Sequence, residues 1–173
     1  MPSEESWKIN GYGLDFGFTN DPTALVHCVL AHGELWTDLL IYDTGLTNPM
    51  IASRAREKGL TKNTRIIADS AEPKSIAELN NAGLWVLPTV KGKDSISVGI
   101  DILQRYKWNV TRRSVGLIEE LRVYKWKKDK DGKETNEPID AFNHAIDATR
   151  YFALKHLNVQ RRGRARAHYN SLD

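Results

Sequence analysis

The chain has 173 residues, of which 40% are hydrophobic and 27% charged. This balance fits one globular domain and excludes collagen, a coiled coil and a wholly disordered chain. The single cysteine, Cys28, excludes a disulfide framework and a thiolate metal cluster, and it fits a reducing compartment. No apolar run approaches the roughly 18 to 20 residues that cross a bilayer, and the polar, acidic N-terminus is unlike a secretory signal.

The net charge of +3 hides an uneven distribution of basic residues, which gather in the C-terminal third. This predicts a phosphate backbone as a neighbour. For the last residues, a frayed and solvated tail is an equally good explanation. The basic residues are Arg112, Arg113, Arg122, Lys125, Lys127, Lys128, Lys130 and Lys133, followed by Arg161, Arg162, Arg164 and Arg166.

The first half of the chain predicts strands in hairpin order, followed by alternating helices and strands. The turn-forming residues between apolar runs, and the Pro and Gly residues that open and close helices, set the boundaries. We expect strands at 12–18, 23–31 and 35–42, a helix at 47–59, a strand at 65–69, a helix at 73–83, a strand at 84–87 and a helix from about 94 with Ile96, Ile100 and Leu103 on one stripe.

The second half predicts a short strand at 107–110 and a helix at 114–123 that turns Leu117, Ile118 and Leu121 inward. A hairpin follows, with its turn at 131–132, and Pro138 opens a last helix that runs to about Leu157. The order predicts an α/β fold with three antiparallel strands followed by parallel strands in a mixed sheet, and helices on both faces. We expect one domain over 1–157 and a basic, flexible tail over 158–173.

The first predicted strand alternates large apolar residues with glycines. The two faces carry Tyr12, Leu14, Phe16 and Phe18 on one side, and Gly11, Gly13, Asp15 and Gly17 on the other. Because glycine weakens a strand, we interpret these glycines as giving bulky ligands access to the Asp15 carboxylate. The alternative is a helix whose backbone packs closely over the glycines.

A second carboxylate, Asp69, follows the buried strand at 65–69, at the end where open α/β sheets bind ligands. The alternative is a cap for the helix that begins near Pro73, and Glu72 could reach the same area or complement that helix dipole.

The last predicted helix carries an apolar stripe and a polar strip at helical spacing. Two carboxylates with an imidazole between them could bind a divalent metal, although a solvated outer face is the common explanation for such a strip. The apolar stripe is Phe142, Ala145, Ile146, Thr149 and Ala153, and the polar strip is Asp140, His144, Asp147 and Tyr151.

Together, Asp15, Asp69 and Asp147 would supply hard oxygen ligands of the kind that Mg²⁺ or Mn²⁺ prefers. Two such ions can activate a water and stabilise the leaving oxygen of a phosphodiester. The sequence holds no zinc motif and no phosphate-binding loop of the nucleotide hydrolases.

Five stretches, in this order along the chain, resemble the nuclease domain of the terminase large subunits of tailed bacteriophages: 13–25, 42–47, 68–74, 91–96 and 143–151. The resemblance implies a ribonuclease H-like fold. It implies a two-metal endonuclease that cuts double-stranded DNA with little sequence preference when phage genome packaging begins and ends.

The resemblance also implies roles for single residues. Asp15, Asp69 and Asp147 would form the metal cluster, with one ion between Asp15 and Asp69 and a second between Asp15 and Asp147. His144 would be an auxiliary ligand or proton-transfer group, and Asp140 would lie outside the direct ligands. Implied partners are DNA, the packaging ATPase domain, the portal and the small terminase subunit, in the cytoplasm of the infected bacterium.

Lysines in two places are candidates for contact with DNA phosphates. Lys91 and Lys93 precede the helix near 94, and Lys125 and Lys127 lie in the predicted hairpin; all four could instead be ordinary surface lysines. Two other functions remain open: a Holliday-junction resolvase or transposase-like nuclease, and a catalytically silent module that docks on DNA or the portal.

Overall fold

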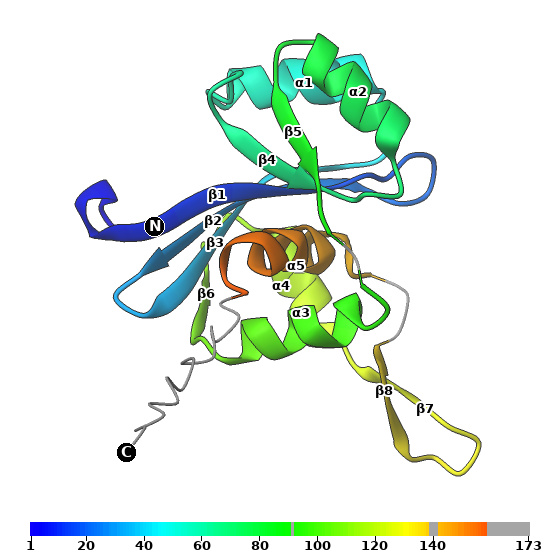
Figure 1. The fold of residues 1–173 in the computed structure, drawn as a ribbon. Coiled ribbons are helices and arrows are strands. Elements are labelled where there is room, and N and C mark those ends of the chain that lie inside the picture. The colour runs from blue at the N-terminus through cyan, green and yellow to red at the C-terminus, as the bar shows by residue number, and fades with distance from the viewer. Residues whose placement is uncertain (91, 139–141, 159–173) are drawn as a thin grey trace, which may run out of the picture.

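The computed structural model describes residues 1–90, 92–138 and 142–158. Within them, a mixed six-stranded sheet has the order β5-β4-β1-β2-β3-β6, and two further strands form a separate hairpin (Figure 1). The strands of the sheet are β1 (Trp7–Asp15), β2 (Thr23–Ala31), β3 (Glu34–Asp43), β4 (Arg65–Ala68), β5 (Trp85–Pro88) and β6 (Trp108–Val110). The hairpin consists of β7 (Trp126–Lys128) and β8 (Glu134–Pro138).

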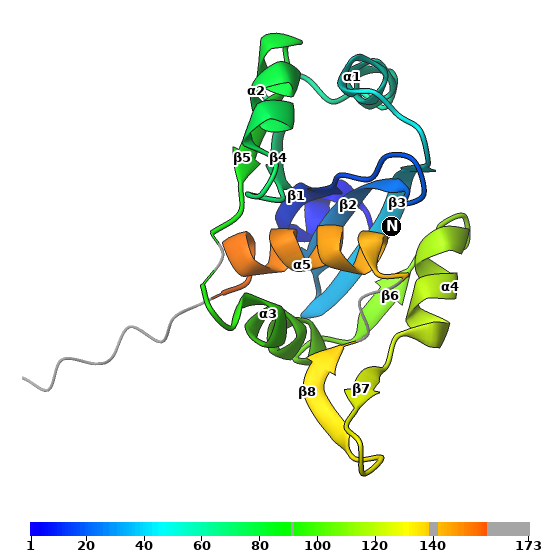
Figure 2. The ribbon, with the colours of Figure 1, turned by 90° about the vertical axis from the view of Figure 1, so that its right-hand side faces the viewer.

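Helices cover both faces of the sheet, as the sequence predicts. Figures 1 and 2 show α1 and α2 on one face, and α3, α4 and α5 on the other. The helices are α1 (Asn48–Glu57), α2 (Pro73–Asn81), α3 (Ser95–Gln104), α4 (Val115–Val123) and α5 (His144–His156), after a short 3-10 turn η1 (Glu4–Ser6). Among the described residues, none of the helices is both long and apolar enough to cross a bilayer.

The direction of the strands follows the predicted order. β1, β2 and β3 are antiparallel neighbours, whereas β4 runs parallel to β1, and β6 runs parallel to β3. Leu14 of β1 lies opposite Ala68 of β4. The next residues along the two strands, Asp15 and Asp69, therefore emerge side by side at the same edge of the sheet.

Two hydrophobic cores, one on each face, hold the layers together. Leu14 and Leu25 pack with α1 and α2, whereas Ala24 and Val26 pack with α3, α4 and α5. Since β2 is buried on both faces, its sequence is a nearly continuous apolar run rather than an alternating one.

The glycines of β1 allow α5 to approach the sheet closely. A Cβ on Gly13 would lie 1.8 Å from the carbonyl oxygen of Ala148, and one on Gly11 would lie 3.1 Å from the Phe152 ring. The interpretation of this face as an access route to Asp15 is therefore wrong for Gly11 and Gly13. Here the alternative holds, because the backbone of α5 occupies that space.

The last helix begins later than predicted. Pro138 ends β8 instead of opening a helix, and α5 starts at His144. Phe142 is 70% exposed in a positive-φ conformation, so it does not belong to the buried stripe. Asp140 lies outside the described residues. The remainder of the stripe is buried, and so are Arg150 and Tyr151, which makes α5 a central helix rather than a surface helix.

Two other residues predicted to face inward are exposed. Ile96, in the first turn of α3, is 47% exposed, and Leu121 of α4 is 36% exposed. In α4 the buried positions are Leu117 and Glu120, so a carboxylate takes the inward place that apolar periodicity gave to Leu121.

Candidate metal centre

The centre of the candidate site is Asp15, the last residue of β1. It is 8% exposed, and burial raises the pKa of its carboxyl, with a smaller rise from the nearby charge of Asp147. Hydrogen bonds from His144 and Tyr151 act in the opposite direction. The site thus concentrates negative charge in a place where water screens it poorly, and a cation bound there would relieve this repulsion.

The Tyr151 hydroxyl joins the two carboxylates that end β1 and β4. It lies 3.1 Å from Asp15 Oδ1 and 3.2 Å from Asp69 Oδ2. Burial and the surrounding carboxylates raise the pKa of Tyr151, so this phenol stays protonated and can donate. Asp69 also accepts a hydrogen bond of 2.8 Å from the backbone N–H of Ala71, which fixes the turn into α2.

His144 opens α5 and lies between two carboxylates. Its Nδ1 is 2.9 Å from Asp15 Oδ2, and its Nε2 is 3.4 Å from Asp21 Oδ1. The hydrogen bond to Asp15 is the main cause that raises the pKa of His144. The imidazole is thereby oriented towards the end of β1.

Asp147 lies one turn further along α5, and Arg150 holds it. The guanidinium donates from Nε to Asp147 Oδ1 at 3.0 Å, and NH2 lies 2.9 Å from Oδ2. Arg150 is 2% exposed and packs over Gly99 of α3, where a Cβ would lie 2.3 Å from its Cγ. Asp147 itself keeps 19% of its side chain exposed.

All three predicted metal ligands line one open pocket of about 290 Å³. The pocket lies between the edge of the sheet, the start of α3 and the first turns of α5. Its walls are Asp15, Asp69, Ser95, Ile96, Asn143, His144, Asp147, Arg150 and Tyr151.

The pocket has the right donors for Mg²⁺ or Mn²⁺, since three carboxylates supply the oxygen ligands that these ions prefer. In the described part of the chain, however, no three His, Cys, Asp or Glu side chains stand close enough together to hold an ion. Tyr151, His144 and Arg150 occupy the carboxylate oxygens instead. An incoming cation would therefore have to replace some of these hydrogen bonds.

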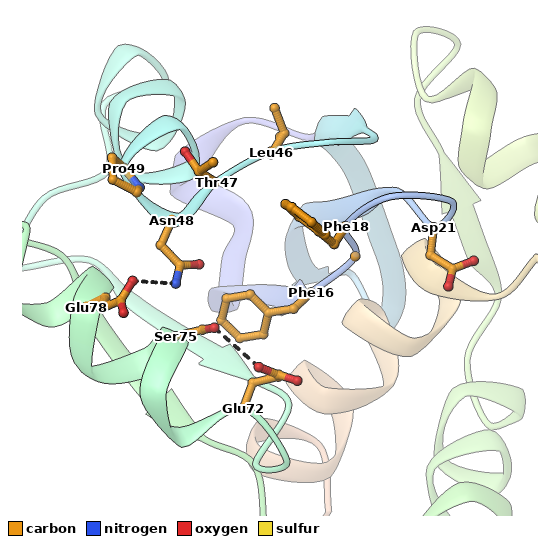
Figure 3. Close-up of a pocket in the computed structure, with 11 residues that line it drawn as sticks. Phe16, Phe18, Asp21, Leu46, Thr47, Asn48, Pro49, Glu72, Ser75 and Glu78 are labelled. Atoms are coloured by element: carbon orange, nitrogen blue, oxygen red, sulfur yellow. Dashed lines mark hydrogen bonds between the residues drawn. The ribbon is translucent and has the colours of Figure 1, made fainter.

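A second, larger hollow of about 460 Å³ opens next to the first, between the loop after β1 and α2. Figure 3 shows Phe16 and Phe18 reaching into it, with Glu72 bonded to Ser75 and Glu78 bonded to Asn48. Asp21, which contacts His144, also lines it. Its carboxylates would repel DNA phosphates, so we place no DNA there.

The predicted DNA-contacting lysines are not gathered at one point. Lys93 is exposed two residues before Ser95, which lines the pocket, whereas Lys125 and Lys127 are exposed at and beyond the end of α4. Lys91 lies outside the described residues. Of the acids given no role from the sequence, Asp43 pairs with Arg54 at 2.8 Å, away from the pocket lining.

Sequence reasoning missed three residues that shape the site: Asp21, Arg150 and Glu120. Arg150 follows Asp147 by three positions, the spacing of an ion pair within a helix, and that signal could have found it. Glu120 lies three residues after the inward Leu117, which marks an acid on a buried face. Asp21 carries no comparable signal, because its contact with His144 depends on how the loop after β1 folds.

Comparison with known proteins agrees with this geometry. The family described as "Terminase RNAseH like domain" matches residues 15–155. The chain belongs to this family. A related protein is the terminase large subunit of Bacillus phage SPP1, 32% identical over 145 residues that make up 80% of this chain and 34% of that protein. This terminase domain thus spans about a third of its relative's length.

Solved structures place the terminase domain in the same fold. The nuclease domain of the SPP1 large terminase with bound Mn has a TM-score of 0.75 at 27% identity, covering 86% of this chain and 87% of that one. The large terminase of a thermophilic bacteriophage gives 0.70 at 20% identity, covering 91% and 41%. The large terminase nuclease of another thermophilic phage, G20c, with bound magnesium gives 0.60 at 18% identity, covering 86% and 81%. The predicted ribonuclease H-like fold is confirmed.

Proposed function

We propose that this terminase domain is an endonuclease that cuts double-stranded DNA with the help of Mg²⁺ or Mn²⁺, two ions being expected. The observation that carries the proposal is the convergence of Asp15, Asp69 and Asp147 on one open pocket, from two strand ends and a helix. The Mn-bound SPP1 nuclease domain supports it, because it shares both the fold and 27% of the sequence.

When bound, the ions would activate water and stabilise the charge on the leaving oxygen of the phosphodiester. The protein's own part is to hold the carboxylates in place. Asp15, Asp69 and Asp147 would bind the ions, and Tyr151 would keep the first two together by its hydroxyl. His144 lies against Asp15 and could take up or deliver a proton at the edge of the pocket.

Partners and setting follow from the family. We propose that the domain acts in phage DNA packaging within the infected bacterial cytoplasm, joined to an ATPase domain and working with the portal and the small terminase subunit. Contact with phosphates rather than bases would explain a low sequence preference.

Digestion of a supercoiled plasmid tests this function. We expect cleavage in Mn²⁺ or Mg²⁺, and none in excess EDTA, because the carboxylates alone cannot activate water. Asp69→Asn should abolish cleavage in the same buffer, since it removes an anionic ligand from the pocket. A wild-type protein that binds DNA and cuts nothing in either metal would favour the silent docking module. A strong preference for four-way junctions over linear duplex would favour a resolvase.

The lysines before α3 allow a separate prediction. We expect the double variant Lys91→Ala and Lys93→Ala to bind DNA more weakly and to lower the slope of log affinity against log salt by about 2, one for each lost phosphate contact. Fluorescence anisotropy at several salt concentrations measures this slope. Lys58→Ala with Lys62→Ala, two exposed lysines elsewhere, is the matched control. Equal slopes for the two double variants would remove Lys91 and Lys93 from the DNA interface.

A further inference from the structure

The buried carboxylate of Glu120 lies at the junction of α4, β3 and α5. The residue is 2% exposed. Its Oε1 accepts hydrogen bonds from the N–H of Ala145 at 3.0 Å and from the Tyr42 hydroxyl at 2.9 Å. Its Oε2 accepts from the N–H of Ile146 at 2.9 Å. Three donors from two other elements therefore meet on one side chain.

The two backbone donors belong to the first turn of α5. The first N–H groups of a helix have no acceptor within the helix, and a side chain just before the helix usually supplies one. Within the described residues, the Asn143 side chain forms no such cap. Glu120 supplies it instead, from a different helix, and its negative charge suits the positive end of the helix dipole.

The Glu120 bonds bracket the functional part of α5. Ala145 and Ile146 lie between His144, which contacts Asp15, and Asp147, which lines the same pocket. A shift of this turn would move both side chains relative to the strand ends.

Glu120 is itself held firmly. Tyr42, at the end of β3, packs its ring on Gly116 of α4, where a Cβ would come within 2.6 Å of the ring. The Tyr42 hydroxyl then reaches Glu120 one turn later. This contact fixes α4 to β3, and Glu120 transmits that position to α5.

The path along the chain between α4 and α5 is much less direct. It leaves α4 at Val123, runs out through β7 and β8, and returns to His144. Figure 2 shows this hairpin extending away from the sheet, beyond α3 and α4. The hairpin therefore cannot set the start of α5 as closely as a direct hydrogen-bonded contact does.

We infer that Glu120 is a positioning residue that fixes the first turn of α5, and with it His144 and Asp147, against the carboxylates at the strand ends. This inference rests on the proposed metal-dependent function. Residues that orient metal ligands from outside typically change metal affinity by about 10- to 100-fold when they are replaced.

Two measurements test the inference on the 173-residue chain. In the wild-type protein, the amide protons of Ala145 and Ile146 should be protected from hydrogen exchange, although neither has an acceptor within α5. In Glu120→Gln, one carboxylate oxygen becomes an amide donor that faces a backbone donor. We expect faster exchange at these two amides and an affinity for Mn²⁺ about 10-fold weaker, measured by calorimetry at a temperature where circular dichroism shows the variant folded.

Glu119→Gln is the matched control, because Glu119 is the exposed neighbour on the same helix. It should keep wild-type exchange and Mn²⁺ affinity. Wild-type Mn²⁺ affinity in a folded Glu120→Gln protein would overturn the inference, and so would unprotected amides in the wild type. If Glu120→Gln does not fold, wild-type amide protection decides. If the wild type binds no Mn²⁺, the proposed function fails, and amide exchange still judges the contact.

Discussion

Asp15→Asn should lower DNA cleavage by about 10³-fold or more while the protein stays folded. Asp15 lies at the centre of the site, between His144, Tyr151 and the charge of Asp147. The asparagine side chain has the same shape but no charge to bind a divalent ion, and loss of one strong electrostatic contribution typically costs about 10² to 10³ in rate. Initial rates of plasmid cleavage in Mn²⁺ measure the effect.

The same variant should not lose stability when metal is absent. Burial raises the pKa of Asp15 in the folded state, so its ionised form opposes folding once the pH exceeds that raised value. A neutral side chain removes this opposition at neutral pH, although it also alters the hydrogen bond with His144. We therefore expect an unchanged or higher melting temperature without metal. Added Mn²⁺ should raise the melting temperature of the wild type but not of the variant.

Asp101→Asn is the matched control for Asp15→Asn, because Asp101 is an exposed aspartate on α3. It should leave cleavage and the Mn²⁺-dependent rise in melting temperature unchanged. Asp15→Asn that keeps a tenth of wild-type activity would show that the carboxylate is not required.

Gly13→Ala should destabilise the fold strongly, because it forces a methyl group into the backbone of α5. The added Cβ would lie 1.8 Å from the Ala148 carbonyl oxygen, so the helix must move away from the sheet. Overpacking of this kind costs about 1–3 kcal/mol, and we expect at least the upper value because the obstacle is backbone. For a domain of this size, about 3 kcal/mol corresponds to a fall of about 6–12 °C in melting temperature.

Gly92→Ala provides the comparison, because no described atom lies within 4 Å of a Cβ at that position. Its melting temperature should match the wild type to within a degree or two. Gly13→Ala should also reduce Mn²⁺ binding, since α5 carries His144 and Asp147. A Gly13→Ala protein as stable as the wild type would mean that α5 packs less closely on β1 than described.

The fold could be predicted well where local signals and topology agree. Turn residues and apolar runs indicated the order of strands and helices, and β2 has the predicted bounds, Thr23–Ala31. The error at the last helix has a physical origin. Pro138 can open a helix or end a strand, and only the pairing of β8 with β7 decides between the two.

The candidate site was only partly predictable from the sequence. Asp15 and Asp69 could be placed together because parallel neighbours in a sheet end at one edge, and the resemblance to terminases added Asp147. The partners that hold these carboxylates depend on side-chain packing between distant elements. Tyr151 contacts Asp15 across 136 positions of the chain, and Glu120 contacts Ile146 across 26. Such contacts leave little trace in local spacing.

Locating Mn²⁺ in crystals of the wild-type domain, by its anomalous X-ray scattering, tests the shared carboxylate site most directly. We expect a peak in the pocket within about 2.1–2.3 Å of oxygens from Asp15 and from Asp69 or Asp147. The Tyr151 and Arg150 contacts should be lengthened or exchanged there. Saturating Mn²⁺ that binds only elsewhere, with Asp147 still held by Arg150 and Asp15 by Tyr151, would contradict the account.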